Sequence, residues 1–197
     1  IRTLMNVRAD KVLRLTMLLH DVAKPVCITT DEEGQDHFKK HPAVGADMTK
    51  QILRRLKFDN KTIDCCCRLV KEHDDRPQIT PKNVRRAMSR IGAGLFPMLF
   101  EVKRADMLGQ SLYKRKEKMA YIDEFERVYN EILSDDQCVS KKDMKINGRD
   151  LIDLGMEPGQ KLGEILDKLY EMVLDDPELN DHEKLIEHAN KIISTLI

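Results

Sequence analysis

The chain has 197 residues, and 41% of them are hydrophobic, which is enough to bury a core and excludes a globally disordered protein. Charged residues make up 35% of the chain, yet the formal net charge is zero, which excludes a uniformly basic protein that coats RNA. Trp is absent and aromatic residues are only 5%, while Leu, Ile, Met, Lys and Glu are abundant, so helices are favoured over strands.

The zero net charge hides an asymmetry along the chain. Residues 1–140 carry 26 Lys and Arg against 21 Asp and Glu, a net of +5, and residues 141–197 carry 8 against 13, a net of −5. A nucleic-acid partner is therefore expected on the first part.

The five cysteines do not form a C-x-x-C pair, and three of them are consecutive: Cys27, Cys65, Cys66, Cys67 and Cys138. This pattern indicates neither a disulfide framework nor a zinc ribbon, so we expect reduced thiols and a cytoplasmic protein. No apolar stretch approaches the roughly 18–20 residues of a membrane span, and no signal peptide is visible. Because the chain begins with Ile1 in helical sequence, we expect a piece of a longer protein.

The first half of the chain is predicted to be helical with one interruption. Residues 1–23 have helical apolar spacing, and we expect Pro25 to end that helix. Residues 26–38 are predicted to form a loop or short hairpin. The next helix should start near Pro42, and Asn60 should cap the one after it. The predicted buried stripe of the Pro42 helix is Val44, Met48, Ile52, Leu53 and Leu56.

The second half continues the helical pattern. Thr80 should cap a helix that ends near Gly92 or Gly94, and two further helices should cover residues 95–107 and about 112–133. Residues 134–142 form a polar break, which predicts domains at 1–135 and 136–197. In the second domain, Asn147 and Asn180 should begin the first and third of three short helical units. No segment alternates with period two, so the fold class is predicted to be all-α.

The strongest chemical signal lies in residues 18–25, LLHDVAKP. His20 and Asp21 are adjacent at the end of an apolar helix, and their side chains can converge on one ion at the mouth of a helical bundle. Imidazole and carboxylate groups are suitable ligands for a divalent metal. A His-Asp pair also arises often by chance, and the alternative is a helix-end histidine beside a surface aspartate.

Three later residues make that alternative less attractive. His41, His73 and Asp106 each fall near the end of a predicted helix, so they can point to the same pole of a bundle. His37 is a rival for His41. The order of these groups resembles the HD phosphohydrolase superfamily, which also uses an earlier histidine on the preceding helix. No histidine precedes His20, so the resemblance places that ligand upstream of Ile1.

Metal chemistry then assigns roles to these residues. We expect His20, Asp21 and Asp106 to hold a primary ion, such as Mg, Mn or Ni, with His20 and Asp21 catalytic. His41 and His73 would complete a second metal position or contact phosphate. Lys24 would bind phosphate as a point charge.

Longer segments narrow the resemblance. Residues 37–58, 84–106 and 143–163 resemble bacterial CCA-adding tRNA nucleotidyltransferases and the related poly(A) polymerase family, and the last segment holds the Gly-Arg-Asp-Leu and Pro-Gly-x-x-x-Gly elements. The resemblance implies an HD-type helical bundle followed by a small helical RNA-binding region. It departs at Ala23, where the family commonly has Gly. The family's catalytic head is absent, so this chain alone is expected to add no nucleotides.

Several arginines are candidate tRNA contacts once this resemblance is counted. They are Arg54, Arg55, Arg85, Arg86 and Arg149, and solvated helix faces are the alternative for them. The expected partners are tRNA and nucleotide or phosphoester substrates, without a membrane, and a homodimer is one expected assembly. Two other functions stay open, a catalytically silent tRNA-binding module and a free-standing HD hydrolase of nucleotides. The segment from Asn147 onward counts against the free-standing hydrolase.

Overall fold

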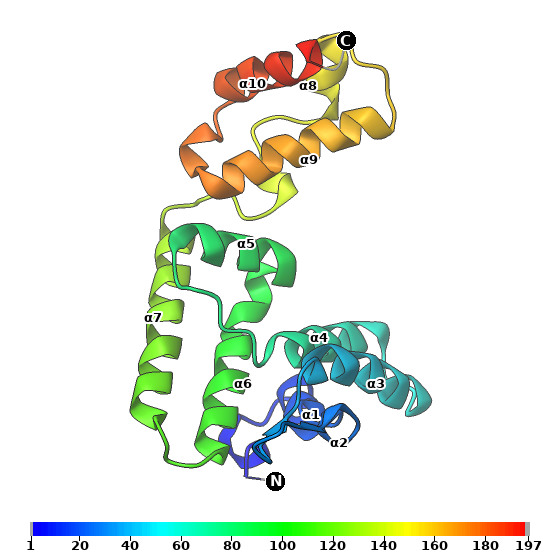
Figure 1. The fold of residues 1–197 in the computed structure, drawn as a ribbon. Coiled ribbons are helices and arrows are strands. Elements are labelled where there is room, and N and C mark those ends of the chain that lie inside the picture. Colours follow the sequence, from blue (N-terminus) through cyan, green and yellow to red (C-terminus); the bar gives the residue numbers. More distant parts are fainter. Residues whose placement is uncertain (1, 196–197) are drawn as a thin grey trace. The chain divides into compact units, whose positions relative to one another are not determined.

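The computed structural model describes residues 2–195, and Ile1, which the first predicted helix included, lies outside them. The described chain is built of helices, as Figure 1 shows, which confirms the all-α prediction. The helices are α1 (Lys11–Leu19), α2 (Lys24–Cys27), α3 (His41–Arg55), α4 (Asn60–Glu72), α5 (Pro81–Ile91), α6 (Phe96–Gly109), α7 (Arg115–Ser134), α8 (Gly148–Asp153), α9 (Gln160–Asp175) and α10 (His182–Ser194). Short 3-10 helices cover Leu4–Asn6, Ala93–Leu95, Lys141–Asp143 and Pro177–Leu179.

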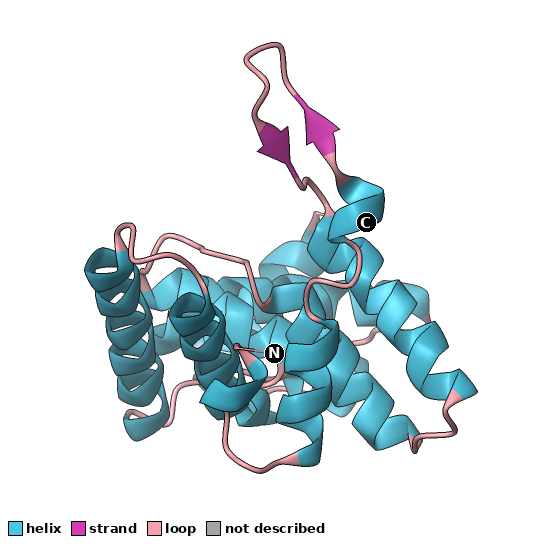
Figure 2. Ribbon diagram, turned by 90° about the horizontal axis from the view of Figure 1, so that it is seen from below, coloured by secondary structure: helices cyan, strands magenta, loops and turns pink. Residues whose placement is uncertain are grey.

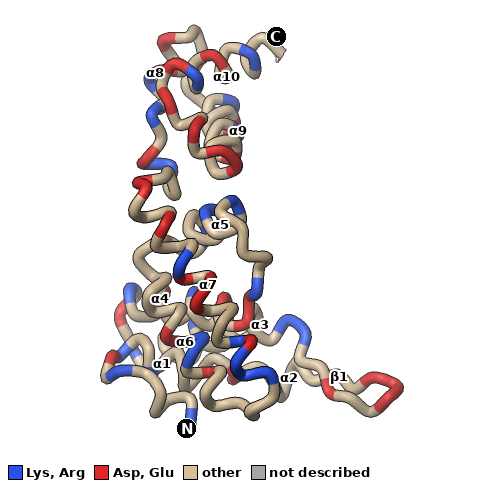
Figure 3. Tube along the Cα trace, turned by 90° about the vertical axis from the view of Figure 1, so that its left-hand side faces the viewer, with Lys and Arg blue, Asp and Glu red and all other residues tan. Residues whose placement is uncertain are grey.

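A small hairpin joins α2 to α3. Its strands β1 (Thr29–Thr30) and β2 (Asp36–His37) pair antiparallel, with Thr29 opposite His37. Within residues 2–195 these are the only strands, and Figure 2 shows them projecting from the helices. The hairpin tip carries Asp31, Glu32 and Glu33, the acidic turn seen beyond β1 in Figure 3. The predicted hairpin is therefore confirmed.

Side-chain caps start several helices where the sequence predicts them. The Thr80 hydroxyl accepts a hydrogen bond from the backbone N–H of Asn83 and begins α5. Asn147 begins α8 and forms a reciprocal capping box with Asp150. Both predictions are confirmed.

Two predicted caps were wrong by one residue. The cap of α4 is Asp59, not Asn60, and the cap of α10 is Asp181, not Asn180. Asp and Asn cap helices about equally well, so adjacent candidates cannot be ranked from sequence. Asn180 instead ties the loop before α8, because its side chain bonds the backbone of Lys145 and Asp143.

The expectation that Pro25 ends the first helix was also wrong. Helix α1 ends at Leu19, and Pro25 lies in the first turn of α2, where its missing N–H costs no helical hydrogen bond. The His20–Ala23 turn therefore separates two helices, and it is this turn that carries the His-Asp pair.

The buried face of α3 differs from the predicted stripe. Val44 and Leu56 are 36% and 58% exposed, and the buried residues of this helix are His41, Gly45, Thr49 and Leu53. A Cβ atom at Gly45 would lie 3.4 Å from Val70 of α4 and 3.7 Å from Ala23. Helix α3 packs so closely here that its contact face uses small and polar residues, which hydrophobic periodicity does not detect.

The chain divides into two compact units. The first unit comprises Ile1–Pro77 and Ala93–Glu126, and the second comprises Gln78–Gly92 and Arg127–Ile197. The apolar cores of the first unit join α1, α3 and α4 on one side and α1 and α6 on another. The core of the second unit is centred on Ile165, Leu169 and Val173 of α9. The functional boundary near residue 135 stays a prediction. None of the described helices is long and apolar enough to cross a membrane.

Candidate metal centre

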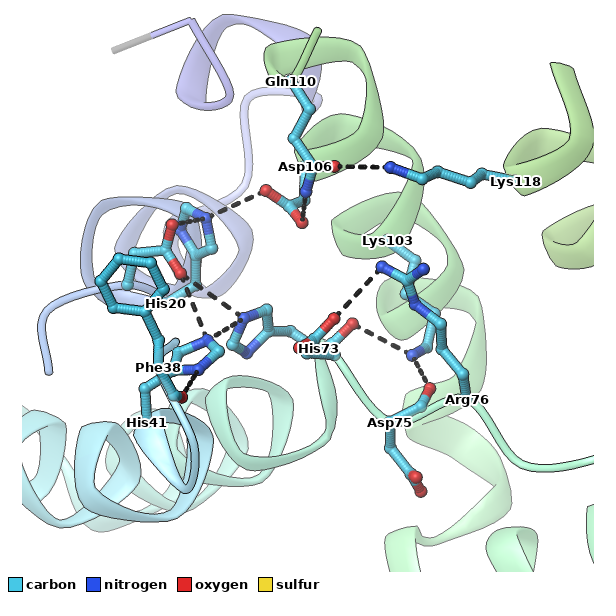
Figure 4. Close-up of polar contacts among 12 residues, drawn as sticks. His20, Phe38, His41, His73, Asp75, Arg76, Lys103, Asp106, Gln110 and Lys118 are labelled. Carbon is cyan, nitrogen blue, oxygen red and sulfur yellow. Dashed lines mark hydrogen bonds and ion pairs between the residues drawn. The ribbon is translucent and has the colours of Figure 1, made fainter. Parts of the chain in front are cut away.

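Four elements of the first unit bring the predicted ligands together. His20 directly follows α1, Asp21 lies in the same turn, His41 begins α3, and His73 directly follows α4. Asp106 projects from the last turns of α6 to the same place, as Figure 4 shows. The three histidines are at most 6% exposed. Each residue reaches the cluster because it lies at or near a helix end, as the sequence predicts.

Asp21 is the centre of the cluster. Its Oδ2 lies 3.3 Å from His20 Nε2, and its Oδ1 lies 3.5 Å from His41 Nε2 and 3.7 Å from His73 Nε2. His20 Nε2 also lies 3.3 Å from Asp106 Oδ1. Two overlapping groups of possible ligands result, one with His20 and Asp106 and one with His41 and His73, and Asp21 belongs to both.

Backbone carbonyls fix the tautomers of all three histidines. The Nδ1 atoms of His20, His41 and His73 donate to the carbonyl three residues earlier, at distances of 2.9, 2.8 and 2.6 Å. A carbonyl only accepts, so each Nδ1 carries a proton, and in a neutral ring the Nε2 lone pair is then free. All three Nε2 atoms point into the cluster. This is the arrangement that metal-binding histidines use.

One contact and one oxygen atom inside the cluster have no hydrogen-bond donor when the histidine rings are neutral. His41 Nε2 and His73 Nε2 lie only 3.3 Å apart, and neither ring in this tautomer has a hydrogen to offer the other. The Oδ1 atom of Asp21 is buried without a hydrogen bond. A buried acceptor without a donor is costly, and a cation among these atoms would satisfy all of them. The residues present therefore fit a divalent metal.

The charges of the cluster adjust to its burial. Burial by itself lowers the pKa of His20, but hydrogen bonds to Asp106 and Asp21 outweigh it and raise that pKa to about 9. Burial opposes ionisation of Asp21, yet hydrogen bonds from His20 and Lys24 hold its pKa well below the usual range. The pKa of Asp106 is lowered in the same way, with burial opposing and His20 prevailing. Without a cation, the cluster is a charged His20–carboxylate network.

Further residues hold the ligands in place. Gln110 Nε2 donates to Asp106 Oδ2 at 2.7 Å, and Lys118 donates to Gln110 Oε1 at 3.2 Å. Lys103 is 6% exposed, and its ammonium bonds the carbonyls of Glu72, His73 and Asp75 at the end of α4. Sequence reasoning missed Lys103 and Gln110. The signal for Lys103 is a cation that stands at helical spacing between the apolar Leu99 and Met107.

A hollow of about 390 Å³ opens beside the cluster, on the side of the hairpin. Its walls include His41, His73 and Asp106, together with Lys24, Phe38 and Lys39. Lys24 bonds Asp21 Oδ2 at 2.7 Å and lies 5.7 Å from the centre of the Phe38 ring. The wall holds Lys24 and Lys39 against the carboxylates of Asp36, Asp74 and Asp106, so the two lysines suit phosphate when a cation offsets the negative charge of the cluster.

The sequence of the chain is similar to part of the tRNA nucleotidyltransferases. The family model for tRNA nucleotidyltransferase domain 2 matches residues 43–189, which include His73 and Asp106. The chain belongs to the tRNA nucleotidyltransferase family. No solved structure matches it significantly.

Two curated relatives cover most of the chain. An A-adding tRNA nucleotidyltransferase of Deinococcus radiodurans is 32% identical over 83% of the chain and 38% of its own length. A CC-adding tRNA nucleotidyltransferase of Thermus thermophilus is 30% identical over 80% of the chain and 35% of its own length. A CCA-adding enzyme of Ligilactobacillus salivarius is 47% identical over 27% of the chain. The chain thus spans less than two fifths of the length of these relatives.

The arginines predicted to meet tRNA differ in their surroundings: some are exposed, one is ion-paired and one is buried. Arg54 and Arg55 at the end of α3 and Arg149 in the first turn of α8 are exposed. Arg86 pairs with Asp175 at 2.8 Å and Glu171 at 3.1 Å. Those pairs reduce the positive charge that Arg86 can offer to a phosphate.

Arg85 has a different place from the one predicted. It is 4% exposed, and its guanidinium donates to the carbonyls of Leu174 and Asp175 and to the side chain of Gln137. Burial lowers its pKa from the ordinary value. The structure uses Arg85 inside the second unit and does not offer it to RNA.

His37, the rival of His41, lies outside the cluster. It belongs to β2, and its Nε2 bonds Asp31 Oδ2 at 2.7 Å across the hairpin. The structure therefore places His41, and not His37, beside His73.

Proposed function

We propose that the first unit binds a divalent metal ion at the His20–Asp21–His41–His73–Asp106 cluster and hydrolyses phosphate esters in the manner of the HD phosphohydrolases. One observation carries the proposal. Three histidines held through Nδ1 turn their Nε2 atoms toward Asp21, and without a cation the His41–His73 contact and the buried Asp21 Oδ1 atom both lack a hydrogen-bond donor. Imidazole-rich ligand sets suit Ni, Fe or Zn better than Mg or Mn, which prefer oxygen ligands.

The residues around the cluster have distinct parts in this proposal. His20, Asp21 and Asp106 would hold one ion, and His41 and His73 would hold a second ion or contact the phosphate. A bound divalent cation supplies hydroxide near neutral pH and neutralises phosphate charge. Lys24 and Lys39 in the wall of the hairpin-side hollow would orient the phosphate.

Metal binding tests the ligand assignment directly. Titration calorimetry with Ni²⁺ and Mn²⁺ should show binding that weakens about 100-fold in His73→Ala, since one ligand is lost. The matched control is His37→Ala, which removes a histidine outside the cluster and should bind as the wild type does. If His73→Ala and His37→Ala bind Ni²⁺ equally, the cluster is not the metal site.

Hydrolysis tests the chemistry. The metal-loaded chain should cleave bis(4-nitrophenyl) phosphate, and Asp21→Asn should lose at least about 100-fold in rate because Asp21 belongs to both ligand groups. Metal binding without any hydrolysis in the wild type would leave a structural metal site and refute the phosphohydrolase activity.

We also propose that the chain is the part of a longer tRNA nucleotidyltransferase that holds tRNA while another part adds nucleotides. The family match and the exposed Arg54, Arg55 and Arg149 support this proposal. The chain alone should therefore incorporate neither CTP nor ATP into tRNA.

Salt dependence tests the tRNA surface. Arg54→Ala/Arg55→Ala should weaken tRNA binding at low salt and reduce its salt dependence. With fewer phosphate contacts, fewer counterions are released when tRNA binds. The control is Lys141→Ala/Lys142→Ala, which removes two exposed cations from the acidic C-terminal part of the chain. Equal binding by both double variants would assign Arg54 and Arg55 to a solvated helix face. Arg85 is unsuitable for this test, since its substitution would damage the second unit.

A further inference from the structure

Gln110 joins two charged side chains beside the metal cluster. Its Nε2 atom lies 2.7 Å from Oδ2 of Asp106, and its Oε1 atom lies 3.2 Å from Nζ of Lys118. Figure 4 shows these two contacts in series, from Lys118 of α7 through the amide to Asp106 of α6. The other oxygen of Asp106, Oδ1, lies 3.3 Å from His20 Nε2. The two oxygens of this carboxylate therefore have different neighbours, the amide for one and the cluster for the other.

The charges of its neighbours determine which way the Gln110 amide faces. An ionised carboxylate accepts hydrogen bonds and has none to donate, while an ammonium group donates and does not accept. The NH2 end of the amide must therefore face Asp106, and the carbonyl end must face Lys118. The reversed amide would set oxygen against oxygen at Asp106 and donor against donor at Lys118.

The backbone around Gln110 is held as firmly as its side chain. Its N–H donates to the carbonyl of Asp106 at 3.2 Å, and its own carbonyl accepts a hydrogen bond of 2.7 Å from Arg115. On another side, Thr3 packs so closely on Gly109 that a Cβ atom there would lie 2.3 Å from Thr3 Cγ2. Contacts from two segments thus fix the end of α6 and keep the amide beside the carboxylate.

The amide bond limits how Asp106 can bind a metal ion. A carboxylate can offer one oxygen or both to a cation. The Gln110 donor occupies Oδ2 and holds the plane of the carboxylate, so Oδ1 is the oxygen that stays turned toward His20. The Asp106 side chain is only 14% exposed, so water has little access to take the place of the amide.

The number of carboxylate oxygens affects which metal the cluster prefers. While Asp106 offers one oxygen, the Nε2 atoms of His20, His41 and His73 make up a large share of the possible ligands. Nitrogen ligands suit Ni²⁺, and additional carboxylate oxygens suit Mn²⁺. A residue that withholds one oxygen from the cluster therefore shifts its preference toward Ni²⁺.

We propose that Gln110 is a positioning residue that keeps Asp106 a one-oxygen ligand and so biases the cluster toward cations that favour nitrogen. Lys118 keeps the amide in the orientation that this role needs. The inference rests on the proposed function, because it requires a metal ion at the cluster. It adds a determinant of metal preference that acts without touching the ion.

Metal preference measures this role separately from the overall strength of binding. The wild-type chain and Gln110→Met are titrated calorimetrically with Ni²⁺ and with Mn²⁺, since Met is unbranched like Gln and has no donor. Gln110→Met should bind Ni²⁺ roughly tenfold more weakly, as expected when the partner of a ligand is lost. Its affinity for Mn²⁺ should change little, because the freed Oδ2 atom compensates. The matched control is Gln51→Met, the same change at an exposed residue of α3, which should keep the wild-type ratio of the two affinities.

General loosening of the cluster gives a different result. It would weaken Ni²⁺ and Mn²⁺ binding by the same factor and leave their ratio unchanged, and that result would overturn the positioning role. Wild-type affinity for both ions in Gln110→Met would overturn it as well. Absence of Ni²⁺ binding in the wild type would instead overturn the proposed function, and this inference with it.

A second variant, Lys118→Met, tests the orientation of the amide. It keeps the donor to Asp106 and removes only the ammonium group behind the amide, so the ratio of the two affinities should change by less than in Gln110→Met. Urea unfolding of both variants should show midpoints close to that of the wild type. A larger change of the ratio in Lys118→Met than in Gln110→Met would assign the effect to the charge on α7 and overturn the role of Gln110.

Discussion

Each compact unit buries one cationic side chain against the end of a helix. In the first unit, Lys103 bonds three carbonyls at the end of α4. In the second unit, Arg85 bonds two carbonyls at the end of α9. Both cations face the negative end of a helix dipole, where positive charge is favoured. The local chemistry of the two sites is nearly the same.

The two sites differ in what the capped helix carries. His73 directly follows α4 and is a member of the His–Asp cluster, while α9 ends in Asp175, which pairs with Lys82 and Arg86 on α5. Burial lowers the pKa of Lys103 to about 8, and it lowers the pKa of Arg85 as well. A buried cation with a shifted pKa is therefore not itself a sign of a functional site. The residues attached to its partners decide what it does.

The largest expected effect comes from Lys103→Met, which keeps an unbranched side chain and removes the ammonium donors. Three carbonyls lose their partner, so the free energy of unfolding should fall by about 3 kcal/mol. Ni²⁺ affinity should also fall, because His73 is no longer held. Urea unfolding, hydrogen exchange and calorimetry measure these effects, with the exposed Lys50→Met as the control. If Lys103→Met binds Ni²⁺ as tightly as the wild type does, Lys103 would support the cluster no more than Arg85 does.

Arg85→Met is the matching change in the second unit. It should lower the free energy of unfolding by roughly 2 kcal/mol, since two carbonyls and Gln137 lose their donor. Hydrogen exchange should rise in α5 and α9 and stay unchanged in α4. Ni²⁺ affinity should equal that of the wild type. A fall in Ni²⁺ affinity would show that the two units are coupled and would break the comparison.

Tyr170→Phe should have a smaller effect in the second unit. The Tyr170 hydroxyl lies 2.9 Å from the carbonyl of Val139 and 2.6 Å from the hydroxyl of Ser89. Its removal should cost about 1 kcal/mol of unfolding free energy, the usual value for a lost hydrogen bond. Urea unfolding of Tyr170→Phe beside Tyr113→Phe, which removes a hydroxyl from a tyrosine that is 70% exposed, separates this loss from that of a solvated hydroxyl. An unchanged midpoint would indicate that water replaces the bond.

The smallest effect concerns acid and the start of α4. Hydrogen bonds from the Thr62 hydroxyl, the Thr62 backbone and Lys11 hold the pKa of Asp59 below its usual range. Because the pKa of Asp59 is lower in the folded state than its unfolded value near 4, its ionised carboxylate stabilises the fold above about pH 4. This stabilisation is lost as the pH falls from there through the folded-state pKa. Asp59→Asn keeps a capping side chain without the charge. Its urea midpoint should therefore fall less than that of the wild type between pH 5 and pH 3. A parallel fall would assign the acid response to other carboxylates.

The sequence predicts that the His and Asp residues of the cluster lie together better than it predicts the packing around them. His20, Asp21, His41, His73 and Asp106 are found because ligands at helix ends leave a pattern in the order of residue types. Lys103 and Gln110 leave no such pattern, since their partners are backbone carbonyls and a side chain four residues away.

The same limit explains the errors in the fold. The buried face of α3 was missed because close helix packing selects Gly45 and Thr49, which periodicity treats as polar or neutral. Arg85 was assigned to RNA because a buried arginine and an exposed one look alike in sequence. Its partners on α9 lie about ninety positions away in the chain, where no local pattern connects them.

The carbonyl bonds of the three histidines have a consequence for how this site can vary in evolution. Met17, Phe38 and Val70 orient the rings through their main-chain oxygens, which every amino acid possesses. Substitutions at these three positions can therefore accumulate without changing which ring nitrogen is protonated. Homologous chains are expected to keep the histidines and to vary at Phe38, and to accept at the buried Met17 and Val70 any side chain that fits the surrounding core.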